Sequence, residues 1–567
     1  MTMKMERLIA VARGQTPADL IFSNARIVNV FTSEIETGNV AIVDGYVAGI
    51  GDYTLAKQTI DLSGKFLMPG LINGHVHIES SMLDVGQYAR AVVPRGTTSL
   101  ITDLHEIANV CGLEGIRYVL DSAKRLPFDI FLMAPSCVPA THMETAGAEL
   151  GVKEIKQLLR LKRCVGLGEM MNYPGVIYGD NTVLAKIVSA QGKVVDGHAP
   201  GLGNKDLNAY VSPGIQSDHE SVMLEEAREK LRRGMRIMIR EGSSEKNLET
   251  LLPLVNDETY QRCMLVVDDR SCVDILNDGD IDAVVRKAIR LGINPVRAIQ
   301  MATINPAEYF RLDRLGAVAP GYFANLVVSR NLKTLPIDMV FYQGRLVARD
   351  REPLFPADKS GRQTLKDTVK IKPFGPEALR LRAKGHTAFV IEIVPGQIIT
   401  KKREMQVRTE DGHIIPDIKR DILKLVVVER HKMTGNIGLG LVTGFGLKKG
   451  ALASSIAHDS HNIVAVGTND ADIFVAIKQI EKMQGGLAVV ANGKILASLP
   501  LPIAGLLSDE PLESVVNSLA RVEKSAAELG VKLASPFSTL SFLALPVIPE
   551  LRLTDIGMVD VKEFKLI

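Results

Sequence analysis

Two kinds of segment alternate from residue 71 to about residue 310, and this rhythm constrains the fold more than any other feature of the sequence. Short apolar runs resemble buried strands, and the stretches between them carry apolar residues at helical spacing. Strands that alternate with helices in this way form parallel sheets. The 240 residues involved are close to the typical size of one closed (β/α)8 barrel. We therefore expect an α/β fold with a TIM barrel over residues 71–310. The clearest runs are TTSLITDL, FDIFLMAP, CVGLGEMM, GKVVDGH, RIMIREGS and CMLVVDD.

The segments on either side of the predicted barrel have short strand-and-turn patterning instead. Residues 1–70 and 311–357 both alternate apolar and polar residues between Gly, Asn and Asp. We expect these two flanks to combine into one small β-sandwich. Residues 351–378 are rich in proline and charge, which predicts a linker. The remaining residues, 358–567, contain the glycine-dense segment GNIGLGLVTGFGLKKG and predict an additional C-terminal α/β domain.

Composition narrows the classes of partner. The 67 Lys and Arg residues nearly balance the 65 Asp and Glu residues, leaving a formal net charge of +2. Nucleic-acid and anionic-membrane surfaces need clustered excess base, so we expect neither partner. No apolar run approaches the roughly 20 residues of a membrane span, and the N-terminus lacks an apolar signal core. Five scattered cysteines without a CxxC pair argue against disulfides and thiolate zinc sites, and we expect a protein of the reducing cytoplasm.

His75 and His77 form an H-x-H pair directly after the apolar segment and turn of MPGLINGH. Side chains two apart on a strand point the same way, so both imidazoles can face one metal ion. Neutral imidazole is a common metal ligand. The pair by itself is a weak signal, because ordinary core or surface histidines produce the same pattern.

Four further polar residues, from different parts of the chain, follow predicted strands of the barrel. A barrel gathers the carboxyl ends of its strands at one face, where barrel active sites lie. Imidazoles and carboxylates without thiolates suit divalent transition ions, and iron, manganese and zinc all accept such ligands. The set of imidazoles and carboxylates suits one or two ions per chain, manganese or iron, with zinc as the alternative. The predicted metal ligands are His75, His77, Glu169, His198, His219 and Asp268.

These residues resemble the amidohydrolase superfamily, whose members share a metal-bearing (β/α)8 barrel and a small β-sandwich. The similarity rests on PGLINGHVH, the two mid-chain histidines, the late aspartate and LGAVAPGYFANLVV. Within the superfamily the chain is most similar to the adenine deaminase family, and this resemblance includes the C-terminal domain. It is carried by NGHVHIESSM, DLHEIANVCGLEGI, GLGEMMNYPGV, DGHAPGL, SDHES and GNIGLGLVTGFGLKKGALASSIAHDSHNIVAVGTND.

The resemblance implies a two-metal centre. Glu169 stands where many relatives have a carboxylated lysine that bridges the two metals, and a glutamate can bridge without that modification. The second ion would be held by His198 and His219. The more buried ion would have three ligands, namely His75, His77 and Asp268.

The implied reaction is the hydrolytic deamination of adenine to hypoxanthine and ammonia, a step of purine salvage. It needs an activated water at C6, a proton for N1 and a proton for the departing ammonia. A metal lowers the pKa of bound water towards roughly 7, and Asp268 is the candidate base that accepts the proton of this water and passes it on. Glu169 or Glu106 could protonate N1, and His105 could polarise the substrate or relay a proton. Residues 102–106, TDLHE, keep this His-Glu pair but lack the proline of the expected Asp-Pro-His-Glu, which puts the loop shape rather than the chemistry in question.

Three residues are candidates for substrate binding, and each has a plainer alternative. Asp269 follows Asp268 on a strand and faces the opposite side, so only one of the two should be a metal ligand, and we favour Asp268 over Asp269. Asp269 then either turns towards the substrate or pairs with Arg270. Glu79 either enters the pocket, caps a helix or supports a metal ligand. His458, in the segment AHDSHN, either closes over the barrel mouth, binds another ion or belongs to a polar turn of a self-contained domain.

Other functions compete with this interpretation. A different amidohydrolase reaction, such as opening a cyclic amide in the manner of dihydroorotase or allantoinase, would use the same metal ring. A non-catalytic scaffold is disfavoured because every expected ligand is present. The deaminase architecture built on H-x-E and P-C-x-x-C is excluded because the chain has no CxxC pair. We expect a small purine substrate and a homodimer, since barrels with large side domains often pair.

Overall fold

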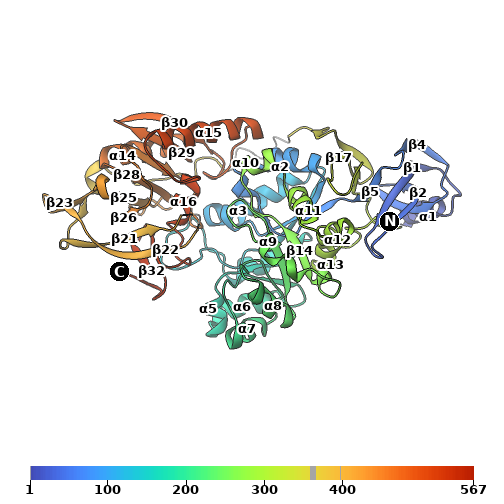
Figure 1. Cartoon of the computed structure of the whole chain (residues 1–567), viewed down its shortest axis with the longest axis horizontal. Coiled ribbons are helices and arrows are strands. Elements are labelled where there is room, and N and C mark those ends of the chain that lie inside the picture. The colour runs from blue at the N-terminus through green and yellow to red at the C-terminus, as the bar shows by residue number, and fades with distance from the viewer. Residues whose placement is uncertain (1, 358–364, 396) are drawn as a thin grey trace.

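The computed structural model describes residues 2–357, 365–395 and 397–567. Figure 1 shows three parts in a row: the first strands of the chain at one end, the βα segment in the middle and the C-terminal elements at the other end. Part of the predicted linker, residues 358–364, lies outside the described residues, as does the start of the predicted C-terminal domain.

One nine-stranded sheet contains strands from both flanks of the βα segment. The two flanks meet where β5 (Phe66–Pro69) pairs antiparallel with β16 (Leu326–Ser329). Helix α1 (Thr2–Ala12), which the sequence analysis did not predict, packs Val11 on this sheet beside Ile21 and Ala41. The remaining strands are β1 (Ala18–Asn29), β2 (Glu34–Val43), β3 (Tyr46–Gly51), β4 (Ala56–Asp61), β17 (Ile337–Tyr342), β18 (Arg345–Arg349) and β19 (Glu352–Pro353).

The middle part contains parallel strands in three hydrogen-bonded pieces. Most residues of its strands are buried, and β8 is buried along its whole length, because helices cover parallel sheets. The five-stranded piece has the order β11-β10-β9-β8-β6, the three-stranded piece the order β12-β13-β14, and the third piece pairs β15 with β7. Their bounds are β6 (Leu71–Asn73), β7 (Val76–His77), β8 (Thr97–Thr102), β9 (Asp129–Ala134), β10 (Cys164–Met170), β11 (Val194–Gly197), β12 (Ser217–Asp218), β13 (Arg236–Arg240), β14 (Cys263–Val266) and β15 (Asp268–Asp269).

One backbone hydrogen bond connects the five-stranded piece to the three-stranded piece. The N–H of Gln216, just before β12, donates to the carbonyl oxygen of Val195 in β11 at 2.9 Å. The third piece follows β14 directly along the chain, and within it the N–H of Asp268 donates to the carbonyl oxygen of His75 at 3.0 Å. The predicted parallel α/β arrangement is therefore present, although the strand pairing runs in pieces and not as one continuous eight-stranded ladder.

Amphipathic helices separate the parallel strands along the chain. In α11 (Ile281–Arg290), Ile281, Val284, Val285 and Ala288 are buried, which is the i, i+3, i+4, i+7 spacing of one helical face. The other main helices are α2 (Val85–Val92), α3 (His105–Ala123), α4 (Val152–Leu159), α5 (Tyr173–Ile177), α6 (Asn181–Ser189), α7 (Asn204–Val211), α8 (Leu224–Arg232), α9 (Leu248–Leu251), α10 (Cys272–Asn277), α12 (Pro295–Met301) and α13 (Ile304–Tyr309).

The C-terminal part is an eight-stranded sheet covered by helices. Strand β25 (Leu423–Val428) shows why both faces are covered: Val426 and Val428 pack with residues of α14 (Asp470–Met483), whereas Leu425 and Val427 join the large core shared with the βα segment. Helices α15 (Leu512–Glu528) and α16 (Pro536–Phe542) also contribute to that large core. The remaining strands of the sheet are β21 (Thr387–Ile393), β22 (Thr400–Gln406), β26 (Ile437–Thr443), β27 (Ala451–Ser454), β28 (Ile463–Gly467), β29 (Gly486–Ala491) and β30 (Lys494–Pro500).

Across the part of the chain that the structure describes, none of the helices combines the length and apolarity needed to cross a membrane.

Candidate metal centre and active site

The H-x-H pair lies at the carboxyl end of the first parallel strands. His77 ends β7 and His75 precedes it, and both rings are buried. Because β7 pairs with β15, Asp268 is brought beside both rings. Its Oδ1 lies 3.4 Å from His75 Nε2 and 3.2 Å from His77 Nε2. These three side chains, predicted to share an ion, therefore form one compact group.

Glu169, near the end of β10, links this group to a second one. Its Oε2 accepts a hydrogen bond from His198 Nδ1 at 2.7 Å and lies 3.2 Å from His219 Nε2. Its Oε1 lies 3.4 Å from His77 Nε2. The rings of His75 and His219 stack with their centroids 4.2 Å apart. All six predicted ligands thus converge on one centre, with Glu169 between the two pairs of histidines.

Buried charges in this centre are balanced locally. Burial alone would raise the pKa of Asp268, but the neighbouring rings of His75 and His77 and the charge of Arg240 hold that pKa well below its usual range. Burial acts in the same way on Glu169, whose pKa is lowered by His219 and His198. Both carboxyl groups are therefore ionised and can act as ligands.

The donor set fits divalent transition ions. Among the described residues, the buried Nε2 of His75 has no hydrogen-bond partner, although it faces two carboxylates. Groups of three or four ligand atoms from these residues lie within 4.8 Å of one another. Imidazole and carboxylate oxygen suit iron, manganese and zinc alike.

Three charged residues at this centre were not chosen from the sequence. Asp103 follows β8 and its Oδ1 lies 3.4 Å from His77 Nδ1. Glu220 follows His219, with Oε1 3.6 Å from that ring. Arg240 ends β13; its Nη1 donates to Asp268 Oδ2 at 2.9 Å and its Nη2 donates to Glu220 Oε2 at 3.1 Å. All three stand at or shortly after the carboxyl end of a parallel strand. This position predicted the six ligands, and it equally predicts these three residues.

His105 and Glu106, the predicted catalytic pair at the start of α3, contact different parts of the structure. His105 Nδ1 lies 3.0 Å from Asp103 Oδ1 and 3.6 Å from Glu169 Oε1, which places it against the metal-ligand group. Glu106 instead meets the C-terminal domain. Its Oε1 accepts from His458 Nδ1 at 2.5 Å, and its Oε2 accepts from His461 Nε2. Both oxygens of Glu106 are therefore occupied by imidazoles.

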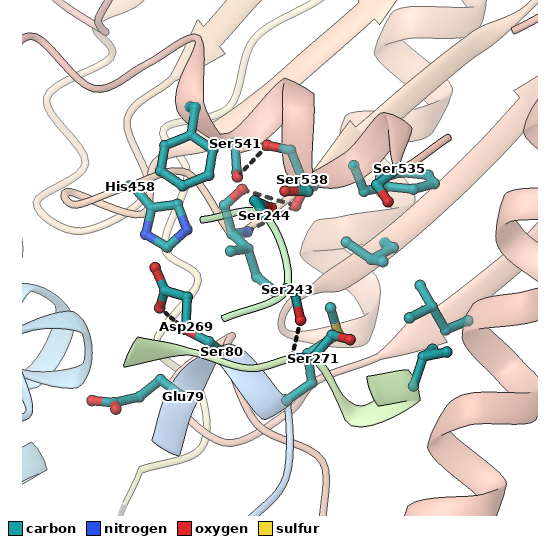
Figure 2. A pocket seen from close by; sticks show the side chains of 18 of the residues that line it. Glu79, Ser80, Ser243, Ser244, Asp269, Ser271, His458, Ser535, Ser538 and Ser541 are labelled. Atoms are coloured by element: carbon teal, nitrogen blue, oxygen red, sulfur yellow. Dashed lines mark hydrogen bonds between the residues drawn. The ribbon is translucent and has the colours of Figure 1, made fainter. Parts of the chain in front are cut away.

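A pocket of about 400 Å³ borders this centre and contains all three predicted substrate-binding residues. In Figure 2 the ring of His458 lies above Asp269, and Glu79 and Ser80 lie below. The His458 ring stacks on Phe542 of α16 with centroids 4.6 Å apart. The pocket is thus walled by the βα segment on one side and by the C-terminal domain on the other.

The contacts of Asp269 and Glu79 bear on the alternatives that the sequence left open for these two residues. Asp269 accepts a hydrogen bond from Ser80 Oγ, whereas Arg270 donates to the carbonyl oxygens of Gly279 and Glu241. Glu79 both meets the start of a helix and lines the pocket: Oε1 accepts from the N–H of Ile107 in α3 at 3.2 Å, and Oε2 has no hydrogen-bond partner among the described residues. Burial, partly opposed by His77, raises the pKa of Glu79 to about 7.

The class of protein follows from this arrangement. Parallel strands that carry a buried His, Asp and Glu centre at their carboxyl ends define an amidohydrolase, and residues 66–347 match the amidohydrolase family. Residues 397–565 match the adenine deaminase C-terminal domain. The chain is 61% identical to an adenine deaminase of Dehalococcoides mccartyi, over 100% of this chain and 99% of that protein. It is 49% identical to adenine deaminase 2 of Carboxydothermus hydrogenoformans, over 99% of this chain and 98% of that protein. The chain belongs to the adenine deaminase family.

Proposed function

We propose that this chain hydrolyses adenine to hypoxanthine and ammonia. The observation that carries the proposal is the 61% identity to an adenine deaminase over the whole chain, C-terminal domain included. The pocket of about 400 Å³ is ample for a single purine base. Purine salvage is the metabolic setting that this reaction would serve.

The metal centre would hold two divalent ions. His75, His77 and Asp268 are assigned to one ion and His198 and His219 to the other, with Glu169 between them. The carboxylate of Glu169 supports this division because each of its oxygens faces a different histidine pair. In this proposal the three parallel pieces form one closed (β/α)8 barrel and the nine-stranded sheet is the small β-sandwich beside it.

Bound divalent ions would supply a strong nucleophile at neutral pH by lowering the pKa of water to about 7. Asp268 would accept the proton of the attacking water and return it to the amino group that leaves from C6. Arg240 holds Oδ2 of Asp268, so that Oδ1 stays directed at the histidines. His105, held by Asp103, would polarise the substrate.

A carboxyl group with a free oxygen in the pocket is suited to supply the proton for N1. Both oxygens of Glu106 and both oxygens of Glu169 already face imidazoles. Among the described residues, Glu79 and Glu245 both line the pocket with one oxygen that has no hydrogen-bond partner. We assign this proton to Glu79, which follows the ligand His77 by two residues. Asp269 and His458, which lie across the same pocket, would orient the purine ring.

Purified, metal-loaded protein tests the proposal directly. Adenine, adenosine and a cyclic ureide are supplied in parallel, and ammonia release and ultraviolet absorbance are followed. We expect turnover of adenine alone. Turnover of the ureide without turnover of adenine would assign the chain a different amidohydrolase reaction.

Two further expectations concern the state of the protein. The five cysteines are free, which suits the reducing cytoplasm. We propose that two chains associate as a homodimer, and light scattering coupled to size exclusion would measure the mass of the particle.

A further inference from the structure

A turn of the C-terminal domain, residues 457–462, contacts the βα segment through Glu106. His458 and His461 both bond to this one carboxylate. One ligand atom from each of the three side chains lies within 4.8 Å of the others, and all three residues are buried or nearly so. The group therefore has the composition of a further cation site, or of a hydrogen-bonded network without a cation.

The hydrogen bonds of His461 distinguish these two readings. The N–H of Ala457 donates to His461 Nδ1 at 3.2 Å, so Nδ1 is an acceptor. A neutral imidazole carries one N–H, and its hydrogen is therefore on Nε2, which donates to Glu106 Oε2. A cation on Nε2 would move that hydrogen to Nδ1, where it would face the N–H of Ala457 as a second donor. Burial lowers the pKa of His461 to about 4, which agrees with a neutral ring.

Side chains of the C-terminal domain donate hydrogen bonds to the backbone of this turn. The fully buried Arg430 donates to the carbonyl oxygen of His461 and, at 3.1 Å, to that of Ala504. His431 Nε2 donates to the carbonyl oxygen of Ser460 at 2.7 Å. His461 has a φ of +54°, a backbone conformation that L-residues adopt only when their surroundings impose it. These contacts hold the backbone of the turn at His461 in one conformation.

The same turn also reaches the substrate pocket. His458 shares the carboxylate of Glu106 with His461, and its ring borders the pocket against Phe542. Asn462 Nδ2 donates to the carbonyl oxygen of Thr145 at 2.8 Å, and this hydrogen bond fixes the turn to the βα segment. A displacement of the Glu106 carboxylate would therefore move the ring of His458 within the pocket.

We propose that His461 is a positioning residue: its Nε2–H holds the carboxylate of Glu106, and Glu106 in turn orients His458 in the pocket. The group binds no cation. This inference rests on the proposed function, because it assigns the C-terminal domain a part in the same active site.

Two substitutions of similar size separate the two ends of the His461 ring. In His461→Asn the amide reaches only the position of Nδ1, so the bond to Ala457 can persist while the bond to Glu106 is lost. In His461→Gln the amide nitrogen reaches the position of Nε2 and can still donate to Glu106. We expect kcat for adenine to fall about 10- to 100-fold in His461→Asn, as misplacement of a pocket group does, with KM changed by less than about 3-fold. His461→Gln should recover most of the rate.

Equal rates in His461→Asn and the parent protein would overturn the proposal, as would a His461→Gln variant no better than His461→Asn. Metal analysis of the parent and both variants provides a second readout. We expect the same number of ions per chain in all three, and the loss of one ion per chain with either substitution would instead identify a cation site.

Histidine ¹⁵N resonances of zinc-loaded protein give a readout that does not depend on turnover. The resonance that disappears in His461→Asn belongs to His461, and we expect it to report a neutral ring protonated at Nε2. A ring protonated at Nδ1 would overturn the inference. A parent protein without adenine turnover but with the Nε2–H signature would refute the proposed function and leave the His461–Glu106 bond established.

Discussion

The two oxygens of Glu169 face different histidines: Oε1 lies 3.4 Å from His77 Nε2, and Oε2 lies 2.7 Å from His198 Nδ1. The two histidines belong to opposite halves of the predicted ligand set, so this one carboxylate contacts both halves. A glutamate in this position can serve two ions at once.

Replacement of Glu169 by glutamine should therefore disturb both ions. Gln keeps the size of the side chain but loses its charge, and we expect metal content to fall below that of the parent protein and kcat/KM to fall by at least about 100-fold. Elemental analysis and adenine kinetics measure the two effects. Glu249→Gln, at an exposed position of α9, is the matched control. A full complement of metal in Glu169→Gln would show that the carboxylate is no ligand.

Substitution of Asp268 by asparagine should abolish turnover and spare the fold. The amide cannot accept the proton of the attacking water, yet it can still accept a hydrogen bond from Arg240. We expect a loss of about 10²–10⁴-fold or more in kcat, the range of general acid–base catalysis, with an unchanged circular dichroism spectrum. Near-normal rates would remove Asp268 from the mechanism.

Lys230 ties two ligand loops together from within α8. Its fully buried ammonium donates to Asp218 Oδ2 at 2.9 Å and to the carbonyl oxygen of Ala199 at 2.7 Å. Lys230→Met would leave the Asp218 carboxylate buried and uncompensated, and we expect the free energy of unfolding to fall by about 3–5 kcal/mol. Arg228→Met on the same helix removes only an exposed ion pair and should cost less than about 1 kcal/mol. Urea unfolding compares the three proteins, and equal losses in both variants would contradict the argument.

The same pair predicts a pH dependence. Burial alone would raise the pKa of Asp218, but Lys230 and Ser221 hold it well below its usual range. A depressed pKa contributes stability above the unfolded value of about 3.9, and this contribution disappears as the pH falls through the folded value. In Lys230→Met the buried carboxyl group instead takes up a proton readily. The stability difference between parent and variant should therefore narrow as the pH falls from 7 to 4, and a constant difference would argue against the pair.

Metal removal should lower both activity and thermal stability. Ions that bind only the folded chain stabilise it in proportion to the logarithm of their concentration over Kd. We expect dialysis against a chelator to abolish adenine turnover and reduce Tm, and manganese, iron or zinc to restore both to different extents. Calorimetry of the chelated protein with an unchanged Tm would mean that no ion is bound at this centre.

Much of this site follows from local sequence signals. Each predicted ligand stands at or just beyond the end of a short apolar run, and parallel packing collects such positions at one edge. Asp103, Glu220 and Arg240 also stand at or just beyond the end of an apolar run. Their place at the metal centre was therefore predictable from the sequence on the same ground as that of the six ligands. Helix α1 also had a visible signal, since Leu8 and Val11 recur at helical spacing.

The contact between Glu106 and His461 had no comparable signal. The two residues are 355 positions apart in the chain. Nothing in either segment specifies how the C-terminal domain packs against the βα segment. The division of the parallel strands into three hydrogen-bonded pieces could not be predicted from the sequence either. The continuity of the strand pairing depends on where the strands bend, and the apolar character of the strands does not specify those bends.

Conversion of adenine by the metal-loaded protein is the measurement closest to the central claim, that six side chains from distant parts of the chain form a metal centre that deaminates a purine. With adenine as substrate and the product separated by chromatography, the account predicts hypoxanthine and ammonia in equal amounts, and neither product from Asp268→Asn. Adenine that stays intact with two ions bound per chain would contradict it.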